Sequence, residues 1–297
     1  MERLVLVAKK LRTEHKFNGY IHLKTIPGAS PELLKEAGLV ADRLSVNVEM
    51  PTEKSLALLA PDKKRKDMIE PMQYLKTAIQ ENKDDKKRLI KTPQFVPAGQ
   101  STQMVIGATP ETDLEILWMA DKFYDRMKLK RVYYSGYVPI SNDNRLPAIG
   151  TPVPNIRENR LYQADWLMRF YQFKVDEIVT TENPLLDIQI DPKLNWALRN
   201  YNLFPVDINT ADYWMIVRVP GIGIQSAQKI ISARRYSKLN WEHLKKMGVS
   251  VQRVSYFIVC GGELLRKELQ PHQVRDRIIA EANSKYHPNF SPQINLF

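Results

Sequence analysis

The sequence predicts an α/β protein built on parallel strands, followed by a small helical region. Short strand-like runs alternate with helix-like segments as far as about residue 180, which is typical of parallel strands joined by crossover helices. Beyond residue 190, helix-like segments flank two glycine-containing turns, at 219–223 and 247–250. With 43% hydrophobic and 26% charged residues, the 297-residue chain is globular and holds one large domain or two ordinary ones.

The predicted elements of the first part follow in order. The chain opens on a helix whose apolar positions 4, 7, 8 and 11 share one face. Strands are expected where short apolar runs end in turn signals, at 20–26, 43–49, 102–107 and 131–138, with a last short strand at 176–179. Helices are expected between them, one capped by Ser30-Pro31-Glu32 and one opening at 109–113.

Two segments of the first part leave alternatives open. The connection 139–158 is rich in proline, asparagine and glycine, and such a long loop is usually a lid or a binding surface. A connector held on the protein surface is an equal alternative. In the helix that follows, Tyr162, Trp166 and Arg169 are spaced closely, which is typical of a core stripe. Charge runs at 63–66 and 83–88 fit solvated helix faces.

The turn Val219-Pro220-Gly221-Ile222-Gly223 is the strongest functional signal. Either glycine can take a positive φ without a Cβ clash, so the chain can turn sharply here. The bare amides and the dipole at the start of the next helix attract a phosphate. Lys229, about one and a half turns further on, is able to reach the same anion. For an isolated Gly-x-Gly, a plain turn between packed helices is the alternative.

The charge and cysteine content narrow the classes of function. The net charge is +11 and the pI about 9.5, which favours a polyanionic partner such as nucleic acid. From Asp207 onward, 13 basic residues stand against 7 acidic ones, so the excess is concentrated around the glycine turn. The sole cysteine, Cys260, excludes an internal disulfide framework and any multi-cysteine metal site, and no metal ligands are predicted. No apolar run approaches 18 residues, so we expect a cytoplasmic protein without a membrane partner.

The run Ile208–Arg235 resembles the helix-hairpin-helix, a module that grips the DNA backbone without reading its sequence. The likeness includes the entry Asn209-Thr210-Ala211, the hairpin 219–223 and the spacing of Ala227, Ile230 and Arg234 after it. A weaker copy follows at 241–259, and such modules often occur in pairs. The resemblance implies non-sequence-specific DNA binding by the hairpin residues, namely Gly221, Ile222, Gly223, Gln225 and Lys229.

In the first part, Thr102–Asp113 (TQMVIGATPETD) resembles the later part of a radical SAM barrel. Four further segments resemble a family of radical SAM proteins ascribed to DNA modification or repair, namely 19–24, 100–104, 133–137 and 161–166. In that family, such a barrel precedes a helix-hairpin-helix. The likeness extends to about Gly262. It implies a partial (β/α) barrel with parallel strands over 1–190 and a tandem helix-hairpin-helix over 191–262. The remaining residues, 263–297, are expected to form one helix and a loose polar tail. The likeness also implies that Gln103, Gly107 and Glu111 lie beside S-adenosylmethionine.

The chain departs from that family in one respect. A [4Fe–4S] cluster needs three thiolates at Cys-x3-Cys-x2-Cys, which this sequence lacks. The first strands of the barrel are also expected to be missing, so the chain resembles the C-terminal part of the family. The cluster and S-adenosylmethionine are therefore expected only with the missing N-terminal part or another subunit. The open interior and edges of an incomplete barrel invite such pairing.

Candidate catalytic side chains lie on the predicted strands, because barrel enzymes carry their sites at the carboxyl ends of strands. Lys24, Asn47 and Glu49 are the candidates, and a satisfied polar network is an equal alternative. Three functions are considered: a DNA-binding, substrate-side portion of a radical SAM enzyme, a non-catalytic DNA-binding protein with a barrel remnant as scaffold, and a metal-independent barrel enzyme. The last ranks lowest because no nucleophile–base or carboxylate pair stands out. Whether the chain is an enzyme is left open.

Overall fold

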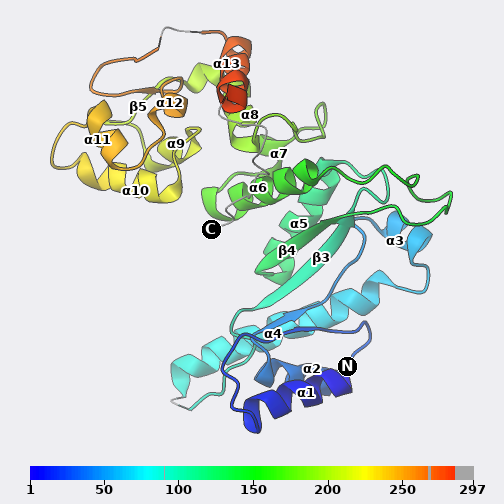
Figure 1. The fold of residues 1–297 in the computed structure, drawn as a ribbon. Coiled ribbons are helices and arrows are strands. Elements are labelled where there is room, and N and C mark those ends of the chain that lie inside the picture. Colours follow the sequence, from blue (N-terminus) through cyan, green and yellow to red (C-terminus); the bar gives the residue numbers. More distant parts are fainter. Residues whose placement is uncertain (90, 267–268, 285–297) are drawn as a thin grey trace. The chain divides into compact units, whose positions relative to one another are not determined.

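The computed structural model describes residues 1–89, 91–266 and 269–284. The chain divides into two compact units (Figure 1). The first comprises Met1–Tyr162 and Thr181–Leu185, and the second comprises Gln163–Thr180 and Leu186–Phe297. Within the described ranges, no helix is both long and apolar enough to cross a membrane.

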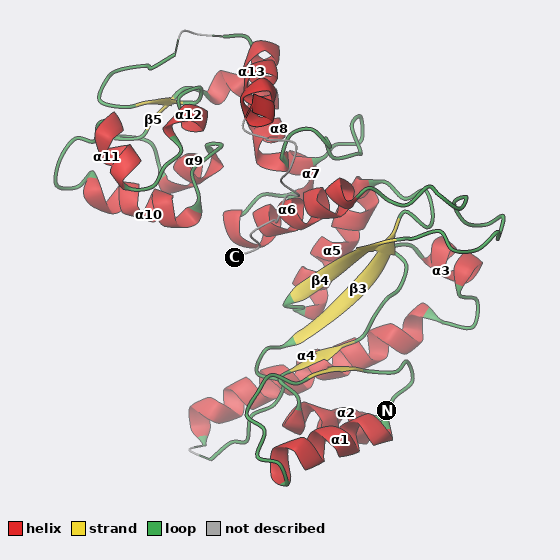
Figure 2. Cartoon of the chain, viewed as in Figure 1, coloured by secondary structure: helices red, strands yellow, loops and turns green. Residues whose placement is uncertain are grey.

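The first unit alternates helices with short strands (Figure 2). Its elements in chain order are α1 (Glu2–Thr13), β1 (His22–Lys24), α2 (Pro31–Val40), β2 (Arg43–Ser45), α3 (Glu53–Leu59), α4 (Arg65–Arg88), β3 (Gln100–Ile106), α5 (Asp113–Met127), β4 (Arg131–Gly136) and α6 (Asn155–Tyr171). The last helix begins in the first unit and ends in the second. The predicted α/β class with parallel strands is confirmed.

The four strands form one parallel sheet in the order β1-β2-β3-β4. Each strand therefore lies beside its predecessor in the chain. Parallel crossovers are almost always right-handed, so a sheet that grows steadily in one direction places all its crossover helices on one face. The register brings four side chains into one row across the sheet: Lys24, Ser45, Ser101 and Arg131.

Burial along the strands shows a covered and an open face. One face is apolar and packs against the helices, with Leu44, Met104, Ile106 and Val132 fully buried. The alternate positions are polar except for Val105, and these seven are at least partly accessible: His22, Lys24, Arg43, Gln103, Arg131, Tyr133 and Ser135. Side chains alternate between the faces of a sheet, so this open polar face extends from β1 to β4, with Ser45 and Ser101 buried in its middle.

The first two strands are shorter than predicted. β2 stops at Ser45. The Val46 N–H still donates to Ser101 O at 3.1 Å, but the Val48 N–H is bonded to the Thr102 hydroxyl at 3.1 Å and not to a strand carbonyl. Pairing resumes only at an isolated bridge between Glu49 and Met104, where Glu49 has φ 63°. The predicted apolar face of the first helix was wrong at two of its four positions. Val5 and Ala8 are buried, whereas positions 4 and 7 are exposed.

Arg12 fixes the end of α1 to the start of the sheet. Its guanidinium donates to the Phe17 and Gly19 carbonyls at 2.7 and 2.8 Å and to Val40 O at 3.1 Å. It also pairs with Asp42 at 2.7 Å, and that carboxylate accepts the Ile21 N–H. One side chain thereby satisfies several loop carbonyls, and a half-buried charge has its counter-ion.

Helix α6 covers the outer edge of β4. The Tyr162 hydroxyl accepts a hydrogen bond from Tyr134 N–H and donates one to Tyr134 O, both at 3.0 Å. The Glu158 carboxylate accepts the Gly136 N–H. These contacts occupy backbone groups that an exposed edge strand would offer to another chain. The opposite edge, β1, is three residues long and carries His22 and Lys24.

The second unit is mainly helical. Besides the end of α6 it contains α7 (Val175–Ile178), α8 (Pro192–Arg199), the 3₁₀ turn η1 (Tyr201–Leu203), β5 (Val206–Asp207), α9 (Tyr213–Arg218), α10 (Ile224–Ala233), α11 (Trp241–Lys246), α12 (Val251–Val254), β6 (Ile258–Val259) and α13 (Pro271–Ser284). The helix pairs α9–α10 and α11–α12 are joined at their entries. The Asn209 side chain bonds both backbone groups of Leu239, at 2.8 and 3.2 Å.

Two expectations for this region differ from the structure, and a third is covered only in part by the described residues. The strand predicted at 176–179 is wrong: helix α7 forms there because Glu177 caps the Lys174 N–H at 2.9 Å and Val175 and Ile178 are buried one turn apart. The second helix of the weaker copy stops at Val254. Strand β6 follows it and pairs in parallel with β5 over two residues. Of the helix and tail predicted over 263–297, helix α13 forms, and residues 285–297 lie outside the described part of the chain.

Replacing Tyr162 by phenylalanine removes both hydrogen bonds to the edge of β4 and leaves two backbone groups unsatisfied. We expect the free energy of unfolding to fall by about 1–3 kcal/mol. The matched control is Tyr133→Phe, whose hydroxyl lies on the open polar face and should change stability little. Urea unfolding followed by circular dichroism measures both variants. Equal losses for the two would contradict the edge-capping role.

Candidate nucleic-acid interface

The turn between α9 and α10 has the signature of a type II turn. Pro220 occupies its second position, Gly221 its third with φ 92°, and Ile222 N–H is bonded to Val219 O at 3.1 Å. A Cβ on Gly221 would lie 3.0 Å from Val254 Cγ1. Both the backbone conformation and the packing therefore demand glycine at this position.

Gly223 is different from Gly221. It is the N-cap of α10, with φ −89° and ψ 172°, a conformation open to any residue. A Cβ here would meet only the Tyr171 hydroxyl, at an ordinary contact distance of 3.6 Å. Neither backbone strain nor packing explains the glycine, and it leaves the start of a ten-residue helix without a side-chain cap.

The predicted contact residues fall into two groups. Gln225 and Lys229 lie one turn apart on the exposed face of α10, above Gly223, while Ala227 and Ile230 are buried on the other face. Ile222 does not belong to this surface. Its side chain is 1% exposed, and its carbonyl accepts a hydrogen bond from Lys193 at 2.5 Å.

The first amides of α10 have no acceptor within the helix. They are the amides of Ile224, Gln225 and Ser226, and the Tyr171 hydroxyl lies close by, 3.6 Å from the position of a Cβ on Gly223. The start of the helix carries the positive end of its dipole, and Lys229 is also positively charged, so this surface suits an anion.

A buried lysine is hydrogen-bonded to the hairpin backbone, and the sequence analysis did not predict it. Lys193, at the start of α8, donates to Ile222 O and lies 4.9 Å from the centre of the Tyr171 ring. Burial lowers the pKa of its ammonium to about 7, although the nearby Asp191 opposes the shift. Nothing in Asp191-Pro192-Lys193 beyond a helix start marks this residue, because its burial depends on distant segments.

The end of α6 carries an exposed aromatic pair. Trp166 is 51% and Phe170 41% exposed, and their ring centres are 4.4 Å apart. The guanidinium of Arg169 lies 4.7 Å over the Phe170 ring and is held by Asp165 at 2.8 Å. The prediction of a core stripe was wrong for Trp166, because the buried side of the helix is formed by Ala164, Asp165 and Leu167.

Tyr171 connects this pair to the hairpin. It is the last residue of α6, and its hydroxyl lies 3.6 Å from the position of a Cβ on Gly223. Burial raises the pKa of Tyr171, so the phenol stays neutral. The helix that carries Trp166 therefore reaches the start of α10.

The open polar face of the first unit holds the candidate catalytic residues. A cavity of about 200 Å³ is lined by His22, Lys24, Ser45, Asn47, Gln103 and Tyr133. Lys24 lies 3.7 Å from the Glu49 carboxylate, which Lys63 also binds at 3.0 Å. Burial, helped by Arg43, lowers the pKa of His22 and favours a neutral imidazole.

The three residues expected beside S-adenosylmethionine are placed apart. Gln103 lines the cavity and accepts from Asn47 Nδ2 at 3.2 Å. Gly107 has φ 74° and packs against Val153 of the long connection. Glu111 is buried, and its carboxylate accepts hydrogen bonds from three hydroxyls: Thr52, Ser55 and Thr109.

The hydrogen bonds from those hydroxyls keep the Glu111 carboxyl ionised. Burial raises the pKa of its carboxyl, but the hydrogen bonds from Ser55, Thr109 and Thr52 outweigh burial and hold the pKa below the usual value. The carboxylate joins the loop after β3 to the first turn of α3, where Thr52 is the N-cap. Glu111 is therefore satisfied within the protein.

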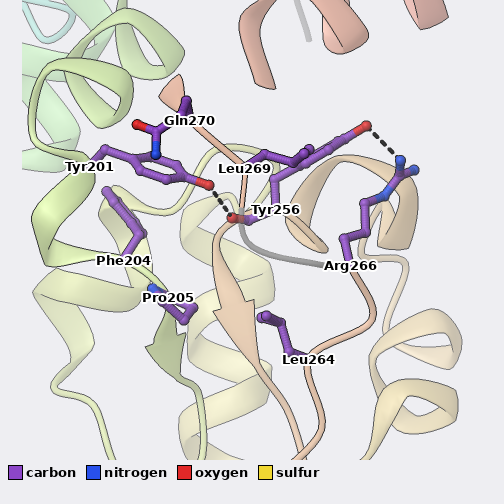
Figure 3. A pocket seen from close by; sticks show the side chains of 8 residues that line it. All are labelled: Tyr201, Phe204, Pro205, Tyr256, Leu264, Arg266, Leu269 and Gln270. Carbon is purple, nitrogen blue, oxygen red and sulfur yellow. Dashed lines mark hydrogen bonds between the residues drawn. The ribbon is translucent and has the colours of Figure 1, made fainter. Parts of the chain in front are cut away.

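Another cavity, of about 390 Å³, lies in the second unit (Figure 3). Arg266 enters it and donates to the Tyr256 hydroxyl at 2.6 Å. Its charge is met by Glu281 at 3.1 Å, and it lies 4.2 Å over the Tyr256 ring. The arginine is thus paired internally, and the lining is otherwise mostly apolar or aromatic.

The residues do not fit an iron–sulfur cluster. In the described parts of the chain, no three His, Cys, Asp or Glu side chains lie close enough to hold a metal ion. Cys260 is buried, and burial raises the pKa of its thiol to about 11, which disfavours the thiolate that a cluster requires.

Comparison of the chain with protein-family models, with curated proteins and with solved structures gave no match in any of the three. The resemblances described from the sequence therefore remain predictions.

The buried Lys193 predicts a pH dependence of stability. Its folded-state pKa of about 7 is lower than the unfolded value, so the unfolded chain binds more protons between about pH 7 and 10.5. The free energy of unfolding should therefore rise with pH across that window, and Lys193→Met should remove this rise. Urea unfolding of both proteins at about pH 6 and about pH 9 measures it. A constant difference between them would contradict the buried, neutralised lysine.

Proposed function

We propose that the second unit binds DNA through its backbone, with a phosphate at the start of α10. Gly223 carries this proposal, because its conformation and surroundings accept a side chain but the sequence provides none. A close approach of a ligand's backbone to the bare amides explains the glycine. Gln225 and Lys229 extend the same surface along the helix.

The electrostatics of the region support a polyanion. Lys229 is exposed, and so are four further basic residues that follow α10: Arg235, Lys238, Lys245 and Lys246. Backbone contacts by such groups neutralise phosphates and release counter-ions, and they carry no sequence information. Binding should therefore be similar for all sequences and should weaken steeply as salt increases.

Gly223→Leu tests the phosphate site without straining the fold. We expect an unchanged thermal midpoint and a loss of DNA affinity that is equal for different sequences, because the side chain blocks the amides. Lys229→Gln should reduce the slope of log affinity against log salt by about one unit. Fluorescence anisotropy with labelled DNA measures both effects.

The matched control for these variants is Lys122→Gln, an exposed lysine on α5 of the first unit. It should leave the DNA affinity and the salt slope unchanged. Full DNA affinity in a folded Gly223→Leu protein would remove the hairpin from the interface.

For the first unit, we propose a partial (β/α) barrel that another polypeptide completes, as in the C-terminal part of a radical SAM protein acting on DNA. Its support is the polar, uncovered face of a sheet whose strands follow one another in order, since all-parallel sheets are normally covered on both faces. The chain itself has no ligands for the [4Fe–4S] cluster, so the cluster and S-adenosylmethionine would enter with the completing part. The alternative is a non-catalytic scaffold for the DNA-binding unit.

Anaerobic reconstitution with iron and sulfide separates these two alternatives. The visible spectrum is recorded for this chain and for a version extended upstream. A cluster in the extended protein alone supports the enzyme, and no cluster in either supports the scaffold.

A further inference from the structure

We propose that the second unit binds single-stranded DNA, with one unpaired base stacked on Trp166 beside the phosphate at the start of α10. The inference rests on the proposed DNA-binding function and names its substrate class. It goes beyond backbone contacts, which do not distinguish paired from unpaired DNA.

The aromatic pair has the properties of a base-stacking platform. Trp166 and Phe170 are large apolar side chains that remain about half exposed, 4.4 Å apart. Arg169 lies over the Phe170 ring, and the fully buried Asp165 fixes its guanidinium. Proteins that bind single strands combine such exposed rings and arginines with a basic track for the backbone.

The platform lies beside the candidate phosphate site. Tyr171 ends α6 five residues after Trp166, and a Cβ on Gly223, the N-cap of α10, would lie 3.6 Å from its hydroxyl. Tyr171 thus links the helix that carries the aromatic pair to the start of α10. This arrangement suits a base and the phosphate of the same or the adjoining nucleotide.

An unpaired base is required for this contact. In a duplex the faces of the bases are stacked on their neighbours, so an exposed indole can only stack on a base that has left the helix or was never paired. The helix-start amides take phosphates from either form. The aromatic pair thus adds affinity for the single strand alone.

The experiment compares single-stranded and duplex DNA of the same sequence, about twelve nucleotides long, by fluorescence anisotropy. Stacking of one base contributes about 1–3 kcal/mol, so Trp166→Ala should weaken single-strand binding by about 5- to 150-fold. Duplex binding should stay within about two-fold. Trp118→Ala, which removes an exposed tryptophan of α5, is the matched control and should alter neither.

A second variant separates stacking from the other properties of the indole. Trp166→Phe keeps an aromatic face but loses the indole N–H, so it should retain most of the single-strand affinity. If Trp166→Phe loses as much as Trp166→Ala, or if Trp166→Ala weakens duplex and single strand equally, the stacking proposal is overturned. Duplex binding that depends on Gly223 while Trp166→Ala has no effect overturns this inference alone. No binding of either DNA overturns the proposed function as well.

Discussion

The order of the strands is the constraint on which the first unit depends. Four parallel strands that follow one another in sequence place their crossover helices on one face. The residues obey this division: Leu44, Met104 and Val132 bury one side, and polar side chains occupy the other. The same arrangement leaves two edges, of which α6 covers one through the Tyr162 hydroxyl. The sequential strand order therefore explains where the core lies, why one face is open and why the outer edge of β4 needs a covering helix.

In the second unit, most groups around the hairpin have a structural role. Gly221 is required by its positive φ, and the Ile222 carbonyl is held by Lys193. Arg234, at the end of α10, is bonded to the Ile208 and Ala211 carbonyls. By contrast, neither Gly223 nor the exposed ring of Trp166 has such a structural role.

Local signals were enough to predict part of this structure. β3, β4 and the start of α5 follow from apolar runs and from the capping box of Thr112 and Glu115, which the structure shows in full. The hairpin follows from its two glycines and proline. The β5–β6 pair, the burial of Lys193 and the exposure of Trp166 depend on segments far apart in the chain. Helix α7 was mistaken for a strand because four apolar and acidic residues fit either period.

Cys260 gives the second unit a built-in reporter. Its thiol is buried, donates to the Leu239 carbonyl at 3.4 Å, and lies where Asn209 joins the two helix pairs. With a pKa raised to about 11 by burial, it should react with alkylating reagents only when this junction opens. Since the sequence contains no other cysteine, the labelling rate of the unmodified protein reads out local opening of one junction, and a bound ligand that tightens the helix pairs would slow it.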